Sequence, residues 1–497
     1  MTESSAAAPV GTAVHKPELA APSALLLTVL MAAIFMAQFD FFVVNVAVPA
    51  LQQDLRVTDG SLELIVGGYA FAYAAGLITG GRLGDLFGHR RVFVAGMLAF
   101  AVTSMLCGLV ANPTQLVIAR LAQGVAAAAM LPQVLGLIKA AFPAGYQPKA
   151  MAWYGVSAGL GAVSGQVLGG LLVSADIAGL SWRPIFLVNL PIGVVVAILA
   201  HKMLPRTPVR ERTSGLDPLG AIGVAAAVAL ILVPLSLGRS EGWPLWTWVS
   251  MAAAFPVAAL TLRGQRLLKR RGGSPMFDVS LVSIASFRAG LLANVAFMLY
   301  FGSYMFTLSM LLQAGLGLSP LAAGLVFTPA ALAFSLAAFA GRRLIGRYGL
   351  RVVVVASLVT AAGLLMLAVR VHLAGLDSGL PWIVATTFLI SLGNGIILPS
   401  LIGTALIDVE PHQAGAAAGM LTASQQFASS AGVALIGMAF FAAVDSRGGQ
   451  AGYPDGMAWA ALIDMVLVLA VAGLVWQLKS NADEDNAAGT GLRQQRD

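Results

Sequence analysis

Residues 81–91 read GRLGDLFGHRR and separate two long apolar runs, 61–80 and 92–110. A helix of about 20 apolar residues can cross a bilayer, so each run is long enough to form one span. Two spans joined by so short a polar segment must lie antiparallel, and Gly88 permits the sharp reversal because it has no side chain. The basic residues that end the segment indicate that it faces the cytoplasm.

The composition is that of a protein with many membrane spans. Of the 497 residues, 58% are hydrophobic and only 10% are charged, and the mean hydropathy is +0.86. A soluble protein of this length needs more charge to cover its surface. The net charge of +7 comes mostly from short loops, which favours a role in membrane topology over nucleic-acid binding.

The sequence gives no support for catalysis or for a cofactor. The one cysteine, Cys107, lies in an apolar run, so neither a disulfide framework nor a cysteine metal cluster can form. No G-x-x-x-x-G-K-[ST] phosphate loop is present. We therefore expect no enzyme, no metal and no cofactor, and an ion gradient as the energy source for any transport.

The hydrophobic pattern predicts an all-α membrane protein with fourteen spans. We expect them at about 25–50, 61–81, 92–111, 114–138, 150–174, 185–204, 216–237, 246–265, 287–313, 319–341, 351–371, 381–405, 413–443 and 457–478. Arg and Lys gather in the loops that follow even-numbered spans, although the acidic loop 408–413 departs from this trend. Both termini are therefore expected in the cytoplasm, in a multi-pass protein of the inner membrane.

An internal repeat predicts the domain organisation. Residues 341–351 read GRRLIGRYGLR, and aligning Gly349 with Gly88 relates this loop to the first one. Such a repeat suggests two related six-helix bundles with a binding site between them. We expect the following order: disordered residues 1–22, a bundle at 23–205, linkers with two extra spans at 206–272, a bundle at 273–479 and a disordered tail at 480–497.

The first loop resembles the cytoplasmic signature of the major facilitator superfamily, G-x-L-x-D-x-x-G-x-R-R. The matching residues are Gly81, Leu83, Asp85, Gly88, Arg90 and Arg91. The arrangement of six, two and six spans is similar to that of the fourteen-helix drug:proton antiporters in this superfamily. The resemblance implies a cytoplasmic gate in which Asp85, Arg90 and Arg91 latch the two halves, against the start of the thirteenth span.

Asp40 is an acid inside the apolar first span, and such residues usually mark a path for protons or substrates. The surrounding FMAQFDFFVVNVAVPAL, residues 35–51, resembles the antiporter signature L-D-x-T-V-V-N-V-A-L-P. Phe42 departs from it by replacing a hydroxyl residue, which makes this wall more apolar. The alternatives are that Asp40 is neutralised by a structural partner and that Asn45 makes only an interhelical hydrogen bond.

Arg120 and Gln123, in the fourth span, resemble the R-x-x-Q-G signature that the superfamily associates with proton coupling. Counting 1.5 Å per residue along the two spans places Asp40 and Arg120 at depths that differ by only about 6 Å. A guanidinium near the carboxylate would hold it charged until substrate or water released it. A permanent structural pair, or an arginine bonded to backbone carbonyls, is the alternative.

The fifth span carries a stripe of small residues that resembles the antiporter motif of exporters, G-x-x-x-G-P-x-x-G-G. The glycines are Gly155, Gly159, Gly165, Gly169 and Gly170. Gln166 stands where the motif has proline, which removes a kink point. Small side chains also allow close helix packing, so the stripe has a purely structural alternative.

Further polar side chains are candidates for the substrate cavity. We place there Asn45, Tyr69, Gln123, Gln166 and Asn394. Asp464, about seven residues into the last span, is expected to face the headgroup region, which leaves the cavity without a second acid. Neutral or monocationic lipophilic drugs are then favoured over multivalent cations.

Together these features predict a monomeric antiporter that exports drugs or antibiotics in exchange for protons by alternating access, with Asp40 and Arg120 coupling the proton. One alternative is a proton symporter that imports a small nutrient on the same fold. Another is a membrane protein that transports nothing, such as a sensor. Coupling to sodium in place of protons also stays open.

Overall fold

A computed structural model describes residues 24–205, 217–238, 241–271, 273, 279–410 and 413–494. It contains fourteen helices, or helix pairs, that are long and apolar enough to span a membrane. This confirms the expected all-α class, and each expected span coincides with one of these segments. The expected disordered residues 1–22 lie outside the described ranges, as do residues 206–216 of the first linker.

The first bundle contains six spans, the last of which is broken. Its helices are α1 (Ala24–Leu55), α2 (Asp59–Phe87), α3 (His89–Leu109), α4 (Pro113–Ala141), α5 (Gln147–Ser174), α6 (Pro184–Leu187) and α7 (Asn189–Met203). The break between α6 and α7 falls at Val188. Pro191 has no amide hydrogen to donate to the Leu187 carbonyl four residues earlier, so the helical ladder is interrupted there.

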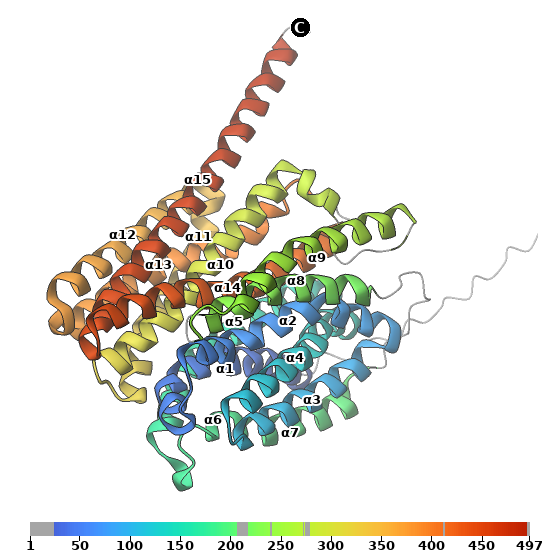
Figure 1. Cartoon of the computed structure of the whole chain (residues 1–497). Coiled ribbons are helices and arrows are strands. Elements are labelled where there is room, and N and C mark those ends of the chain that lie inside the picture. Colours follow the sequence, from blue (N-terminus) through green and yellow to red (C-terminus); the bar gives the residue numbers. More distant parts are fainter. Residues whose placement is uncertain are drawn as a thin grey trace, which may run out of the picture.

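The second bundle and two extra helices complete the fold. The extra pair is α8 (Pro218–Gly238) and α9 (Leu245–Arg270), and the second bundle is α10 (Ala285–Met310), α11 (Pro320–Tyr348), α12 (Arg351–Ala374), α13 (Leu380–Ala405), α14 (Ala414–Arg447) and α15 (Tyr453–Gln494). Figure 1 shows the two bundles side by side. α15 continues to Gln494, beyond the span that ends at Leu478, where the sequence predicts a disordered tail.

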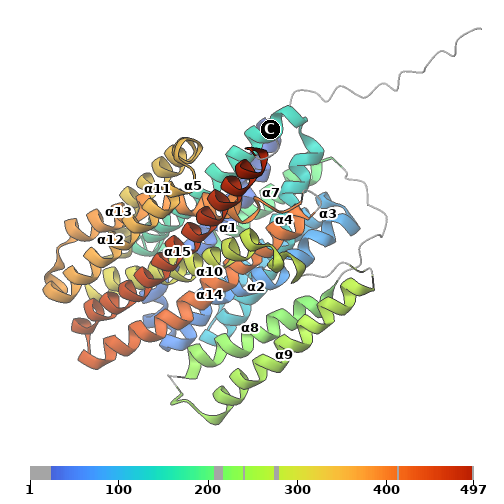
Figure 2. The ribbon, with the colours of Figure 1, turned by 90° about the horizontal axis from the view of Figure 1, so that it is seen from above.

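The extra pair lies outside both bundles, as Figure 2 shows. α8 packs against α2 of the first bundle and α14 of the second, while α9 packs mainly against α8. Gly60 of α2 permits this approach, because a Cβ there would lie 1.9 Å from the Ser236 carbonyl oxygen. Large side chains of α9 such as Trp248 and Phe255 are exposed, as expected for a surface in contact with lipid.

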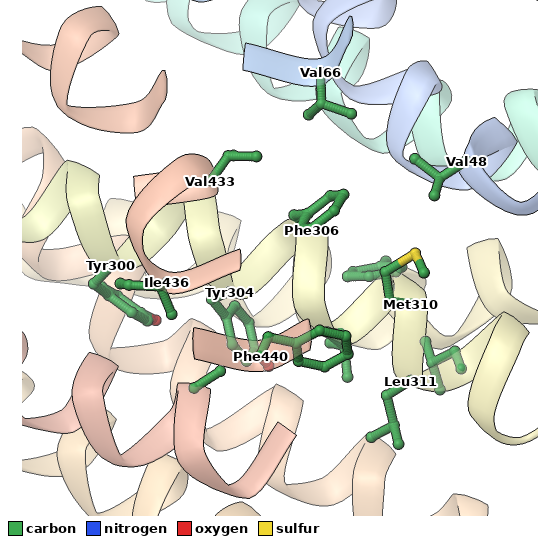
Figure 3. Packing of buried hydrophobic residues seen from close by; sticks show 14 of the residues in the cluster. Val48, Val66, Tyr300, Tyr304, Phe306, Met310, Leu311, Val433, Ile436 and Phe440 are labelled. Carbon is green, nitrogen blue, oxygen red and sulfur yellow. The ribbon is translucent and has the colours of Figure 1, made fainter. Parts of the chain in front are cut away.

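The two bundles meet at the end of the molecule where α1 and α5 finish. There the Ser309 hydroxyl of α10 donates to the Asn45 carbonyl at 2.6 Å, and the Leu321 amide of α11 donates to the Ser174 hydroxyl at 3.2 Å. Figure 3 shows apolar side chains of both bundles in one cluster at this seam, with Val48 and Val66 facing Phe306, Met310 and Val433. This end is therefore closed in the present conformation.

Helices within a bundle approach closely at glycines, which yields a test of the packing. A Cβ on Gly80 of α2 would lie 1.9 Å from the Ala128 carbonyl oxygen of α4, whereas a Cβ on Gly473 of α15 would meet nothing within 4 Å. We expect Gly80→Val to destabilise the protein by about 1–3 kcal/mol through overpacking, and Gly473→Val to leave it nearly unchanged. Thermal unfolding of the purified protein in detergent measures both, and equal melting temperatures would contradict this packing.

Candidate functional site

Asp40 lies near the middle of α1 and is completely buried. Arg120 of α4 donates from Nη1 to Oδ2 of Asp40 at 2.5 Å. Gln123 Nε2, one turn further along α4, donates to Oδ1 at 2.7 Å, and Asn189 Nδ2 of α7 donates to Oδ1 at 3.1 Å. The depth estimate from the sequence therefore identifies two residues that form a direct ion pair.

The hydrogen-bond partners define the protonation state of Asp40. All three are N–H donors, and a carboxylate is a pure acceptor, so no carboxyl proton is needed to complete the network. The network therefore favours the ionised form of Asp40 in this conformation. Burial of both charges is tolerated because the pair is close and the remaining lone pairs accept amide hydrogens.

Arg120 is held by several groups besides Asp40. Its Nη1 also donates to Gln123 Oε1 at 2.9 Å, and its Nε donates to the Ile65 carbonyl of α2 at 3.3 Å. The guanidinium carbon lies 4.7 Å from the ring centre of Tyr69, which gives a cation–π contact. The Nη2 atom is buried and has no partner, so the cation is not fully satisfied.

Asn189 is a member of the site that the sequence analysis did not assign. It begins α7 at the helix break, and its amide bridges Asp40 and the Ser104 hydroxyl of α3, which lies 3.0 Å away. Ser104 in turn donates to the Phe186 carbonyl at 2.9 Å. The available signal was Pro191, two residues further on, which interrupts the helical hydrogen-bond ladder next to this amide.

The predicted cavity residues are distributed over several places. Tyr69 and Gln123 belong to the Asp40–Arg120 network. Asn45 lines a pocket between the bundles. Gln166 of α5 is buried with both amide atoms unpartnered, whereas Asn394 of α13 donates to the Tyr300 hydroxyl at 2.7 Å inside the second bundle.

The pocket between the bundles is mostly aromatic and apolar. It is lined by Phe41, Phe42, Asn45, Val66, Gly67, Ala70, Phe301, Gly302, Met305, Ser429, Ser430 and Val433, a lining in which the described residues include no charged side chain. Phe42 of α1 and Phe301 of α10 meet edge to face across it, with ring centres 6.4 Å apart. The free space is only about 10 Å³ in this conformation, so the surface would suit an apolar ligand, oriented by a few hydroxyl and amide groups, only after the bundles separate.

The stripe on α5 divides into two parts. Gly165 and Gly169 pack against α1, since a Cβ on Gly165 would lie 2.8 Å from the Phe39 carbonyl oxygen. A Cβ on Gly170 would lie 2.4 Å from the Pro320 carbonyl oxygen of α11. Gly155 and Gly159 meet nothing within 4 Å, so the stripe brings α5 close to both bundles only toward its end.

The first loop, residues 81–91, makes the expected reversal between α2 and α3. Gly88 has φ +88° and joins α2 to α3, a conformation that favours glycine. Asp85 lies 3.6 Å from His89 Nε2, and His89 Nδ1 lies 2.8 Å from Gln133 Oε1 of α4. The expected latch against the start of α14 cannot be located, because residues 411–412 and the side chains of 414–416 are outside the described part.

The position expected for Asp464 was wrong, and a second buried acid, Glu63, was not identified from the sequence. Asp464 does not face the headgroup region: it is completely buried, and its Oδ1 lies 2.7 Å from the Ser303 hydroxyl oxygen. Glu63 of α2 is buried beside a cavity of about 160 Å³ that Asp59 and Asp445 also line. Asp464 lies within the second bundle, whereas Glu63 lies where α2 meets α8 and α14, and the sequence pattern alone resolves neither position.

Comparisons with known proteins agree with this architecture. The family described as Major Facilitator Superfamily matches residues 30–432. The chain is 37% identical over 445 residues to a probable actinorhodin transporter of Streptomyces coelicolor, covering 88% of this chain and 76% of that protein. It is 33% identical to puromycin resistance protein pur8 of Streptomyces alboniger, with coverage of 82% and 80%.

A further relative and a solved structure are similar over most of the chain. Multidrug resistance protein Stp of Mycobacterium tuberculosis is 31% identical, with coverage of 81% of this chain and 73% of that protein. A bacterial homologue of the human lysosomal transporter Spinster, in an inward-facing conformation, aligns with a TM-score of 0.65 at 15% identity and covers 91% of this chain and 96% of that one. The likeness to the solved structure shows the fold.

The buried pair yields a stability prediction. Arg120→Met strands the Asp40 carboxylate, and breaking a buried pair in this way costs about 3–5 kcal/mol. Adding Asp40→Asn removes the stranded charge, so the double variant should recover most of the loss. The control is Arg183→Met, which breaks a partly exposed pair with Asp54 whose atoms are 2.7 Å apart, and which should cost about 0–1 kcal/mol.

Thermal unfolding in detergent compares the four proteins. A double variant as unstable as Arg120→Met alone would contradict an ionised Asp40, because removal of the carboxylate would then have brought no relief.

Proposed function

Because the chain belongs to the Major Facilitator Superfamily, and is therefore a membrane transporter and not an enzyme, we propose that it exports lipophilic antibiotics or drugs in exchange for protons. The observation that carries the proposal is the mid-membrane carboxylate Asp40 with its matched cation Arg120. The names of the relatives, which include an actinorhodin transporter and a puromycin resistance protein, support small-molecule efflux as the direction of transport.

The pocket between the bundles supports a neutral or singly charged apolar substrate. Its aromatic rings offer dispersion and stacking contacts, while Asn45, Ser429 and Ser430 offer hydrogen bonds. The Asp40 carboxylate already accepts hydrogen bonds from three protein groups, so it is not available to a substrate in this conformation. Gln166 has an amide with no partner and is a candidate to contact the substrate.

Proton exchange at Asp40 would change the packing of the first bundle. A proton on Asp40 removes the ionic attraction to Arg120. The added acid hydrogen then points toward groups that are themselves hydrogen-bond donors, one guanidinium and two amides. The network must then rearrange, which biases the equilibrium between two conformations of α1 and α4. Loss of the proton restores the closed pair seen here.

The charge pattern supports an orientation and a state. The basic loops lie at the end of the bundles that includes Gly88, opposite the closed seam, and such loops remain in the cytoplasm. The closed end is then extracellular and both termini are cytoplasmic, so an opening between the bundles in this state would face the cytoplasm. Asp85, Arg90 and Arg91 would hold the cytoplasmic ends together in the opposite state. A single chain is sufficient for this cycle.

The first experiment tests coupling at Asp40. In proteoliposomes that contain equal amounts of folded protein, Asp40→Asn should abolish substrate-driven proton release, because the side chain no longer titrates. Asp54→Asn, on the same helix but at the partly exposed pair with Arg183, is the matched control and should retain exchange. Exchange at the wild-type rate in Asp40→Asn would refute the role of this carboxylate.

A second experiment tests the orientation. With the buried Cys107 replaced by serine, single cysteines are introduced by Gly346→Cys at the end of α11 and by Asp377→Cys in the turn that follows α12, both exposed positions. A membrane-impermeant maleimide should label intact cells only at position 377, and position 346 only after the membrane is opened. The reverse pattern would place both termini outside.

A further inference from the structure

Asp464 lies midway along its candidate membrane span. It lies fourteen residues from each end of the span Gln450–Leu478, which corresponds to about 21 Å of helix on either side. It is completely buried between α15 and α10, and its Oδ2 atom has no hydrogen-bond partner. A charged carboxylate in such a place needs a cation or several donors.

The surroundings of Asp464 supply neither. Among the described residues it has no ion-pair partner, and the titratable groups that face it are the hydroxyls of Tyr300 and Tyr304 on α10. Those hydroxyls are engaged by Asn394 and Thr387 of α13. The nearest charged groups on α15 lie at its start, where Asp455 is paired with Arg447 and His372.

Counting protons around Ser303 indicates the state of Asp464. The Ser303 hydroxyl oxygen lies 2.8 Å from the Tyr300 carbonyl oxygen and 2.7 Å from Oδ1 of Asp464. The hydroxyl has one proton, and the carbonyl can only accept. Ser303 can donate fully to only one of these two oxygens. An acid proton on Asp464, donated to the Ser303 oxygen, completes the second contact and leaves the Ser303 hydroxyl free to donate to Tyr300.

The two bundles therefore hold their carboxyl groups in opposite states. In the first bundle, the acid lies on the first helix, α1, and is ionised among N–H donors from α4 and α7. In the second bundle, the acid lies on the last helix, α15, and contacts a hydroxyl on the first helix, α10. In each bundle the acid contacts a residue on the helix pair formed by the first and last spans, α1 with α7 and α10 with α15. The acid is on the first span in one bundle and on the last span in the other.

We propose that Asp464 is a second proton-binding site of the transport cycle, occupied in this conformation and emptied after Asp40. This inference rests on the proton coupling proposed above. On release, the acid O–H bond breaks, the proton passes to water admitted by the conformational change, and the carboxylate remains. Rotation of the Ser303 hydroxyl then lets it donate to Asp464, so one short side-chain movement serves both states.

The main test measures the ratio of protons to substrate in proteoliposomes. Asp464→Asn imitates a permanently protonated acid, so it should still move substrate but with a proton ratio reduced about twofold. Asp464→Glu restores a titratable group and should return the ratio toward the wild-type value. Asp377→Asn, at an exposed acid of the same bundle, is the control. An unchanged ratio in folded Asp464→Asn protein would make Asp464 a structural acid and overturn the proposal.

Infrared spectroscopy tests the proton directly and does not depend on transport. The wild type at neutral pH should show a carboxylic-acid C=O band that Asp464→Asn lacks. If that variant does not fold, Ser303→Ala should shift the frequency of the band, because the acid loses its hydrogen-bond acceptor. Absence of the band from the wild type, or a band that Ser303→Ala leaves unmoved, would overturn the assignment.

The two proposals fail in different ways. If the wild type moves substrate without any proton flux, the antiport proposal fails, whatever the spectra show for Asp464. If the wild type exchanges protons for substrate and Asp464→Asn does so at the same ratio, only the second site fails.

Discussion

The first bundle is organised around a buried negative charge, the Asp40 carboxylate, which is shielded from bulk solvent. The Asp40 carboxylate is stable there only because α4 supplies a cation and an amide and α7 supplies a second amide. Three helices are thereby fixed in register around one side chain. A change in the charge of that side chain must alter the hydrogen bonds that join all three helices.

The architecture could be predicted because it depends on long stretches of sequence. Span length, the distribution of basic loops and the repeat at 341–351 each average over many residues, and the fourteen spans follow from them. The Asp40–Arg120 pair could also be predicted, since depth along two antiparallel helices needs only a residue count. These inferences do not require knowledge of which face a helix turns toward its neighbour.

The remaining parts of the site depend on helix rotation, which the sequence leaves open. Asp464 was expected near the headgroups, yet it points into the bundle at Ser303, because α15 packs that face against α10. Asn189 reaches Asp40 from the first residue of α7, at the junction with α6. Asn394 turns toward Tyr300 within its own bundle. Nearly uniform hydrophobicity around each helix removes the amphipathic signal that would otherwise reveal these directions.

The position of α8 has a mechanical consequence. This helix touches α2 of one bundle and α14 of the other, with the glycine at position 60 allowing near contact between backbones. If the bundles rock against each other, α8 cannot follow both of them. It must then slide along one of them while it stays packed against the other. Breaking those contacts would add to the free-energy barrier between the two states, so the lipid-facing hairpin of α8 and α9 would slow their exchange.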